Sequence, residues 1–148
     1  MKPSCKTCKN INCFIKSNFS IAKISSLDKL KTTTELKKGE YVYRKNGKAK
    51  EVYMLYRGCV ELIKKSENGS KGTIFFVEPG ELFGYRSVLS EEPHNTSAKV
   101  YRNSQICVLK ELDFFRLFES NKGLAKKFMK FLSKQFRARE KKLDRRIT

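Results

Sequence analysis

The chain has 148 residues, of which 39% are apolar and 11% aromatic, a composition that allows one packed domain and argues against wholesale disorder. Its 33 Lys and Arg outnumber 15 Asp and Glu, for a net charge of +18, which indicates either attraction to polyanions or a solvated Lys-rich surface. No stretch approaches the roughly 20 apolar residues of a membrane span, and the N-terminus lacks the apolar run of a secretory signal. A cytoplasmic location with no membrane partner is therefore expected.

The first half of the chain changes character twice. Residues 1–17 hold three of the five cysteines. Residues 18–34 predict one or two short helices, because Phe19, Ile24, Leu27 and Leu30 recur at roughly helical spacing.

Residues 35–110 then have strand character. Turn signals at Asn46-Gly47, Asn68-Gly69 and Pro79-Gly80 separate short apolar runs. The predicted strands are 40–44, 52–56, 59–63, 73–77, 100–101 and 106–109, with Gly58 as the break between the second and third. Many short strands with regular turns predict a mainly β domain, either a sandwich, a barrel or a β-roll.

From Leu112 the pattern becomes helical, with a short helix over 112–118 and a long one after Asn121-Gly123. The long helix has a row spaced alternately four and three, typical of a coiled-coil seam: Leu124, Phe128, Phe131, Gln135 and Ala138. A second row lies beside it: Met129, Leu132, Phe136 and Leu143. Both rows can pack on the β domain of the same chain, but so wide a stripe favours a parallel homodimer.

Three cysteines, Cys5, Cys8 and Cys13, lie within nine residues. Cytoplasmic proteins rarely carry disulfides, so metal binding or thiol redox chemistry is favoured. Thiolates at this spacing suit zinc or an iron–sulfur cluster, and both take four ligands. The candidates for the fourth ligand are Cys59, Cys107 and His94.

Several motifs over residues 18–148 resemble the sensor half of the Crp/Fnr family of bacterial transcription regulators. They are Leu36–Glu40, Tyr56–Val60, and Pro79–Gly84 followed by Glu92-Pro93 and Ser97-Ala98. The resemblance implies an antiparallel double-stranded β-helix, a jelly-roll-like β-roll, over 18–118 with short flanking helices. It also implies a dimerisation helix over 119–148, and a helix-turn-helix DNA-binding domain that is missing from this chain. The chain is expected to be either cut before that domain or a natural stand-alone sensor, and the helical pattern that continues to Thr148 favours a cut.

The resemblance also bears on cyclic nucleotides. Relatives that bind them have a carboxylate where this chain has Tyr85, and an arginine where it has Asn95 or Thr96. Both charged anchors are replaced, so cyclic AMP binding is not expected. A weaker ligand-binding set remains for another anion, with Arg86 as a substitute cation: Glu81, Tyr85, Arg86, Thr96 and Ser97.

The oxygen-sensing branch of the family binds a four-iron–four-sulfur cluster through three N-terminal cysteines and one distal cysteine. The distal cysteine lies nine residues after the alanine of the cassette, and here Ala98 plus nine is Cys107. The chain departs from that branch by having four residues, not five, between Cys8 and Cys13. The resemblance implies Cys5, Cys8, Cys13 and Cys107 as ligands of an iron–sulfur cluster, with zinc as the alternative.

The sequence thus predicts a sensing and dimerisation domain for oxygen or redox state, and not an enzyme. The chain has a single histidine, and no catalytic triad, phosphate-binding loop or paired-carboxylate pattern. Two alternatives stay open. One is a small-anion or nucleotide-binding regulatory module without metal, and the other is a zinc-stabilised nucleic-acid-binding protein.

Overall fold

The computed structural model describes residues 3–10, 13–19, 21–119 and 121–147. The chain divides into two compact units, Met1–Asp113 and Phe114–Thr148. Thr148, the last residue of the predicted helix 119–148, lies outside the described residues. Among the described residues, no helix is both long enough and apolar enough to cross a membrane.

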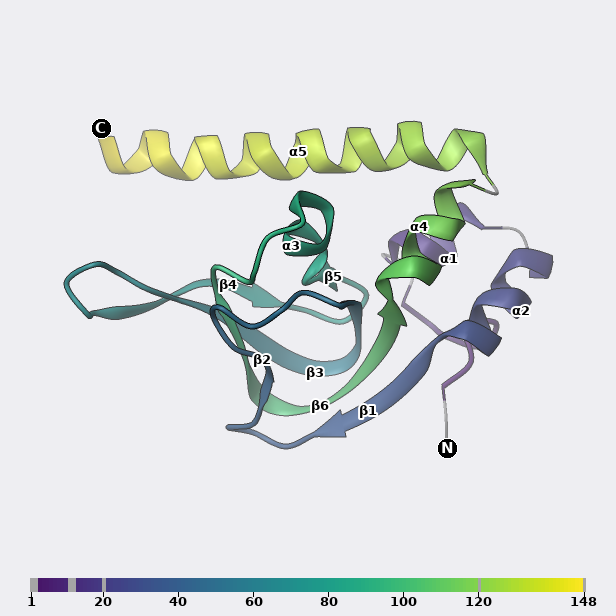
Figure 1. Cartoon of the computed structure of the whole chain (residues 1–148), viewed down its shortest axis with the longest axis horizontal. Helices are drawn as coiled ribbons and strands as arrows, with labels where there is room; N and C mark the ends of the chain where they lie inside the picture. Colours follow the sequence, from purple (N-terminus) through teal and green to yellow (C-terminus); the bar gives the residue numbers. More distant parts are fainter. Residues whose placement is uncertain (1–2, 11–12, 20, 120, 148) are drawn as a thin grey trace. The chain divides into compact units, whose positions relative to one another are not determined.

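The first unit is built on an antiparallel six-stranded sheet (Figure 1). Its strands are β1 (Thr32–Leu36), β2 (Tyr41–Tyr43), β3 (Glu51–Lys65), β4 (Lys71–Val77), β5 (Leu82–Phe83) and β6 (Ser97–Lys110). The order is β1-β6-β3-β4, with β2 paired to β6 and β5 paired to β3. The two long central strands therefore each carry two short partners, one toward each end.

The prediction of separate strands on either side of Gly58 is wrong, because β3 runs through it. The register between β3 and β6 shifts on both sides of this glycine, from Leu55 to Val60. Gly58 has φ +104° and lies against β6, where a Cβ would meet Ser104 Oγ at 2.3 Å. Gly58 is thus a bulge that bends a continuous strand. The predicted strands 100–101 and 106–109 are likewise one strand, β6.

Three short helices accompany the sheet: α1 (Phe14–Asn18), α2 (Ile21–Leu30) and α3 (Tyr85–Ser90). The helical region predicted over 18–34 is too long, since β1 begins at Thr32. Three consecutive β-branched threonines, 32–34, explain this early change to a strand. Helix α3 follows Gly84 in a left-handed conformation and was not predicted.

The core of the first unit is built from apolar side chains of β3, β4, β5 and β6. It is formed by Leu55, Val60, Leu62, Val77, Phe83, Ala98, Val100, Ile106 and Val108. Alternate residues of a strand point to opposite faces. Ile106 and Val108 therefore face this core, and the intervening Cys107 faces the other way.

The second unit contains most of α4 (Glu111–Glu119) and all of α5 (Lys122–Ile147). Phe114, Phe118 and Phe128 form an aromatic cluster, with ring centroids 5.1 to 5.8 Å apart. Of the predicted seam, Leu124 and Phe128 are buried, Phe131 and Gln135 are half-buried, and Ala138 is exposed. The strongly exposed apolar residues of α5 belong to the neighbouring row: Met129, Phe136 and Leu143.

Candidate metal centre

Cys107 lies in the middle of the sheet, on the face away from the core. It pairs with Thr33 of β1 and with Met54 of β3. Its side chain is nevertheless only 7% exposed. Residues outside the sheet core must therefore cover Cys107. They are Lys31, just after α2, and the N-terminal segment with Cys8 and Cys13.

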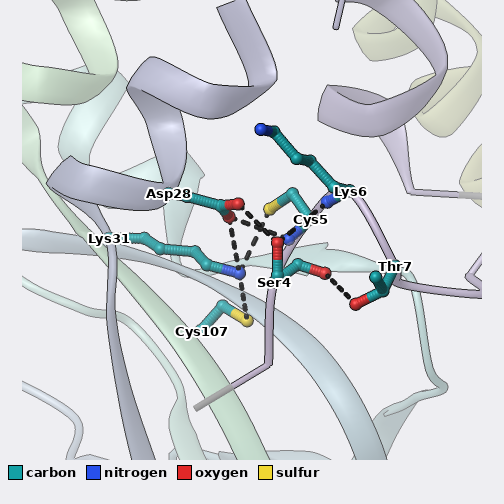
Figure 2. A network of polar contacts seen from close by, with 7 residues as sticks. All are labelled: Ser4, Cys5, Lys6, Thr7, Asp28, Lys31 and Cys107. Atoms are coloured by element: carbon teal, nitrogen blue, oxygen red, sulfur yellow. Dashed lines mark hydrogen bonds and ion pairs between the residues drawn. The ribbon is translucent and has the colours of Figure 1, made fainter.

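The N-terminal segment is fixed to α2 by Asp28 (Figure 2). Ser4 Oγ donates a hydrogen bond to Asp28 Oδ2 at 2.6 Å, and the Cys5 amide donates one to Asp28 Oδ1 at 2.8 Å. Farther along, Asn10 Nδ2 donates to the Tyr56 carbonyl oxygen of β3 at 3.0 Å. These bonds hold the segment against α2 and the sheet, and so determine where Cys5 and Cys8 lie.

Lys31, just after α2, joins the N-terminal segment to β6. Its Nζ lies 3.1 Å from Cys5 Sγ, 4.0 Å from Cys107 Sγ and 3.4 Å from Asp28 Oδ1. The Lys31 residue is only 2% exposed, although a lysine is almost never fully buried unless it is paired. Figure 2 shows this ammonium between the two sulfurs, with the carboxylate beside it.

The pKa values of Cys5, Asp28 and Lys31 depend on one another. Burial raises the pKa of the Cys5 thiol to about 11, although Lys31 opposes the shift. Burial favours a higher pKa for Asp28 as well, but hydrogen bonds from Ser4 and from the Cys5 amide prevail and lower its pKa to about 2. Burial works to lower the pKa of Lys31, but Cys107, Cys5 and Asp28 outweigh it, and the pKa is raised. Lys31 is therefore a buried cation and Asp28 its carboxylate partner.

Cys8 and Cys13 are the two other cysteines of the predicted ligand set. Both are half-buried, and Cys13 immediately precedes α1, whose Ile15 is buried. Burial raises the pKa of Cys107, and the nearby Cys8 and Cys13 raise it further while Lys31 opposes them. Cys8 and Cys13 are thus near enough to Cys107 to affect its thiol, and Cys5 is joined to Cys107 through Lys31.

The surroundings of these cysteines suit a thiolate-bound metal. Thr33, the direct partner of Cys107 across the β1–β6 pair, has a buried hydroxyl with no hydrogen-bond partner among the described residues. Directly opposite residues of an antiparallel pair share a face, so this donor lies on the side of Cys107. Within the described part of the chain, no three His, Cys, Asp or Glu side chains are already grouped to hold a single metal ion. The chemistry of the donor set, four cysteine thiols of which two contact a buried cation, fits an iron–sulfur cluster or zinc.

The two other candidates for a fourth ligand have surroundings of their own. The Cys59 amide donates to Ser104 Oγ at 3.1 Å, and Cys59 pairs with Arg102 of β6, not with the Cys107 level of the sheet. His94 is buried and stacks on Tyr43, with ring centroids 3.6 Å apart. Tyr53 and Phe83 extend this stack.

The residues of the predicted ligand-binding set mostly serve local structure. The Glu81 carboxylate accepts the Glu78 amide, and Ser97 Oγ accepts the Lys45 amide. Thr96 is buried and hydrogen-bonded to Tyr43. Tyr85 is buried and Arg86 is exposed at the start of α3.

Ser4, Asp28 and Lys31 were missed by the sequence reasoning. A signal for Lys31 existed, because it lies four residues after Leu27 and seven after Ile24, and so continues the apolar row of α2 one residue past the end of that helix. A lysine that continues a buried apolar row needs an anionic partner, and Asp28, three residues earlier, supplies one.

Comparison with known proteins agrees with this architecture. The model of the cyclic nucleotide-binding domain family matches residues 33–121. The anaerobic regulatory protein of Bacillus subtilis is 25% identical over 118 residues, which cover 79% of this chain and 50% of that protein. The transcriptional activator protein Anr of Pseudomonas protegens is 27% identical over 137 residues, 90% of this chain and 54% of that protein.

The solved structure of the Thermus thermophilus catabolite activator protein superposes with a TM-score of 0.78 at 20% identity, over 88% of this chain and 62% of that one. The predicted fold, mainly antiparallel β with flanking helices and a long C-terminal helix, is thereby confirmed. The chain spans about half the length of the curated relatives it matches. By their names, one of these relatives is a regulatory protein and the other a transcriptional activator. Its matched domain, fold and relatives together place this chain in the Crp/Fnr family of transcription regulators.

Proposed function

We propose that this chain is the sensing and dimerisation part of a Crp/Fnr-type transcription regulator, and that it senses oxygen or redox state. In this proposal Cys5, Cys8, Cys13 and Cys107 hold an iron–sulfur cluster. The observation that carries it is the contact of Lys31 with both Cys5 and Cys107. Residues 102 positions apart in the sequence thereby share one buried cation.

The names of two relatives also support the proposal of a regulator that responds to oxygen or redox state. One is an anaerobic regulatory protein by name, and another is a transcriptional activator. The anion-binding alternative has less support, since Glu81, Thr96 and Ser97 are engaged in hydrogen bonds within the chain. A cluster would supply electron-transfer chemistry and sensitivity to oxidants, while the residues around it supply the thiols, the cation and the hydrogen bonds.

The output of the sensor follows from the order of elements. Cys107 is three residues from the end of β6, and α4 begins at Glu111. We propose that α5 pairs with the same helix of a second copy through its apolar rows, and that DNA is bound by a part of the regulator beyond this chain. A marginal pairing can be shifted by a few kcal/mol of differential binding.

The test is purification without oxygen, followed by a visible spectrum and analysis of iron, sulfide and zinc. The proposal expects a brown protein with equal iron and sulfide that bleaches in air. Cys8→Ala and Cys107→Ala should lose the colour. Cys59→Ala is the matched control, because it removes a buried cysteine that the proposal leaves out of the site.

Two outcomes would contradict the cluster, and a third would contradict its fourth ligand. A colourless protein with bound zinc would point to the zinc alternative. A protein that takes up neither iron nor zinc on reconstitution would point to thiol chemistry or to an anion. Loss of colour in Cys59→Ala, with Cys107→Ala still coloured, would show that the fourth ligand is wrong.

A further inference from the structure

We infer that Lys31 and Thr33 are positioning residues for a thiolate-bound metal centre, in which Lys31 supplies a compensating positive charge and Thr33 an O–H hydrogen-bond donor to sulfur. This inference rests on the proposed function, since it names groups that act on the four cysteines. It adds two residues that no cysteine pattern identifies.

The case for Lys31 begins with its charge. A metal centre held by four thiolates is net negative, and burying a net charge without a partner is costly. Lys31 Nζ is within 4.0 Å of both Cys5 Sγ and Cys107 Sγ, and Lys31 is 2% exposed. Among the hydrogen bonds and ion pairs of the described residues, Lys31 supplies the one charged nitrogen in contact with these two sulfurs. Asp28 Oδ1 lies 3.4 Å from the same ammonium.

The case for Thr33 rests on its hydroxyl, a hydrogen-bond donor that has no acceptor among the described residues. Its hydroxyl is buried and makes no hydrogen bond among the described residues, and buried polar groups are nearly always paired. It stands directly across the β1–β6 pair from Cys107, in the register that places both on one face. A sulfur atom bound to a metal on that face would be an acceptor for this hydroxyl.

Both residues should raise the reduction potential of the bound cluster. Reduction adds negative charge, which a nearby cation and a hydrogen bond to sulfur each stabilise. Lys31→Met keeps the length of the side chain and removes the charge, and Lys31→Arg keeps the charge. Thr33→Val keeps the shape and removes the hydroxyl. Lys29→Met is the matched control, because Lys29 is an exposed lysine near the end of α2, two residues before Lys31.

The experiment is anaerobic reconstitution of the whole chain with ferrous iron and sulfide, followed by a redox titration of each variant. For a one-electron step, a tenfold change in the equilibrium constant equals about 59 mV. We expect Lys31→Met to lower the potential by about that amount, Lys31→Arg to restore most of it, and Lys29→Met to leave it unchanged. Thr33→Val should lower it by a smaller shift.

Thr33→Val also separates this role from a structural one. In the metal-free chain it removes an unpaired buried hydroxyl, so its thermal midpoint should be equal to or higher than that of the wild type. A structural hydroxyl would instead give a lower midpoint and an unchanged potential.

Iron and sulfide binding tests the proposed function, and the reduction potentials of the variants test this inference. A wild-type chain that binds no iron and sulfide overturns both this inference and the proposed function. Loaded Lys31→Met and Thr33→Val with wild-type potentials overturn the inference alone. If Lys31→Met fails to fold, Lys31→Arg and Thr33→Val decide: a lower potential in Thr33→Val with a near-wild-type Lys31→Arg supports the inference, and an unchanged one in Thr33→Val rejects it.

Discussion

Ser4 Oγ donates a hydrogen bond to Asp28 Oδ2 at 2.6 Å, and this contact bridges 24 residues of sequence. The same carboxylate accepts the Cys5 amide and pairs with Lys31. Asp28 is therefore the link through which α2 holds both the N-terminal segment and the buried cation. Its ionisation should govern how well the cysteine-bearing segment stays in place.

Replacing Asp28 by Asn should make the stability of the metal-free chain less dependent on acid pH. The pKa of Asp28 is lowered from 3.8 to about 2, so its stabilisation is complete above about pH 5 and is lost as pH falls toward 2. Above about pH 5, we expect Asp28→Asn to unfold with about 1–2 kcal/mol less free energy than the wild type. Urea unfolding over this pH range measures the difference, which should shrink toward pH 2. A constant difference at every pH would contradict the role of the charge.

Gly58→Ala should destabilise the first unit strongly. The new Cβ would meet Ser104 Oγ at 2.3 Å and the Asn103 carbonyl oxygen at 2.5 Å, at a φ of +104°. Clash and backbone strain together should cost about 3 kcal/mol. Gly69→Ala is the control, since its φ of +86° adds strain while the space around it is open, and about 1 kcal/mol is expected. Equal losses in denaturant unfolding would show that the contact with β6 is unimportant.

His94 should make the stability fall in mild acid. Burial against Tyr43 lowers the pKa of His94 below 6.5, so the unfolded chain takes up a proton that the folded chain does not. Stability is thus full above about pH 7 and declines as pH falls from about 6.5 toward the lowered pKa. His94→Gln should abolish this dependence, because the chain has no other histidine. Unfolding free energies at about pH 7.5 and pH 5.5 test it, and an equal drop in both proteins would contradict it.

Phe136→Glu should weaken self-association while leaving the fold intact. Phe136 is 65% exposed within the chain, so the substitution removes little internal packing. It lies seven residues from both Met129 and Leu143, the spacing of a pairing helix. Sedimentation should show at least a tenfold weaker dimer, roughly 1.4 kcal/mol. Lys130→Gln, which makes the same change of net charge at an exposed position of α5 away from both apolar rows, is the control, and equal behaviour of both variants would point to another interface.

Local patterns predicted several elements well. The change from two-residue to helical periodicity near Leu112 corresponds to the passage from β6 to α4. The turns at Asn46-Gly47 and Asn68-Gly69 fall between β2 and β3 and between β3 and β4. These features succeed because they depend on residues near one another in the chain. The same local reasoning fails at Gly58, where contact with a strand more than 40 residues away decides that the glycine is a bulge.

The sequence by itself determined the family resemblance, the kinds of element, and four cysteines as the proposed ligands. Only the tertiary structure decided what surrounds those cysteines. In the sequence, Lys31 continues the apolar row of α2, which indicates an anionic partner but does not identify the cysteines beside it, and Thr33 is one of three adjacent threonines. Their burial beside Cys107 arises because β1 pairs with β6 and α2 precedes β1. The environment of a charge is set by every element that packs around it, and spacing along the chain does not encode that environment.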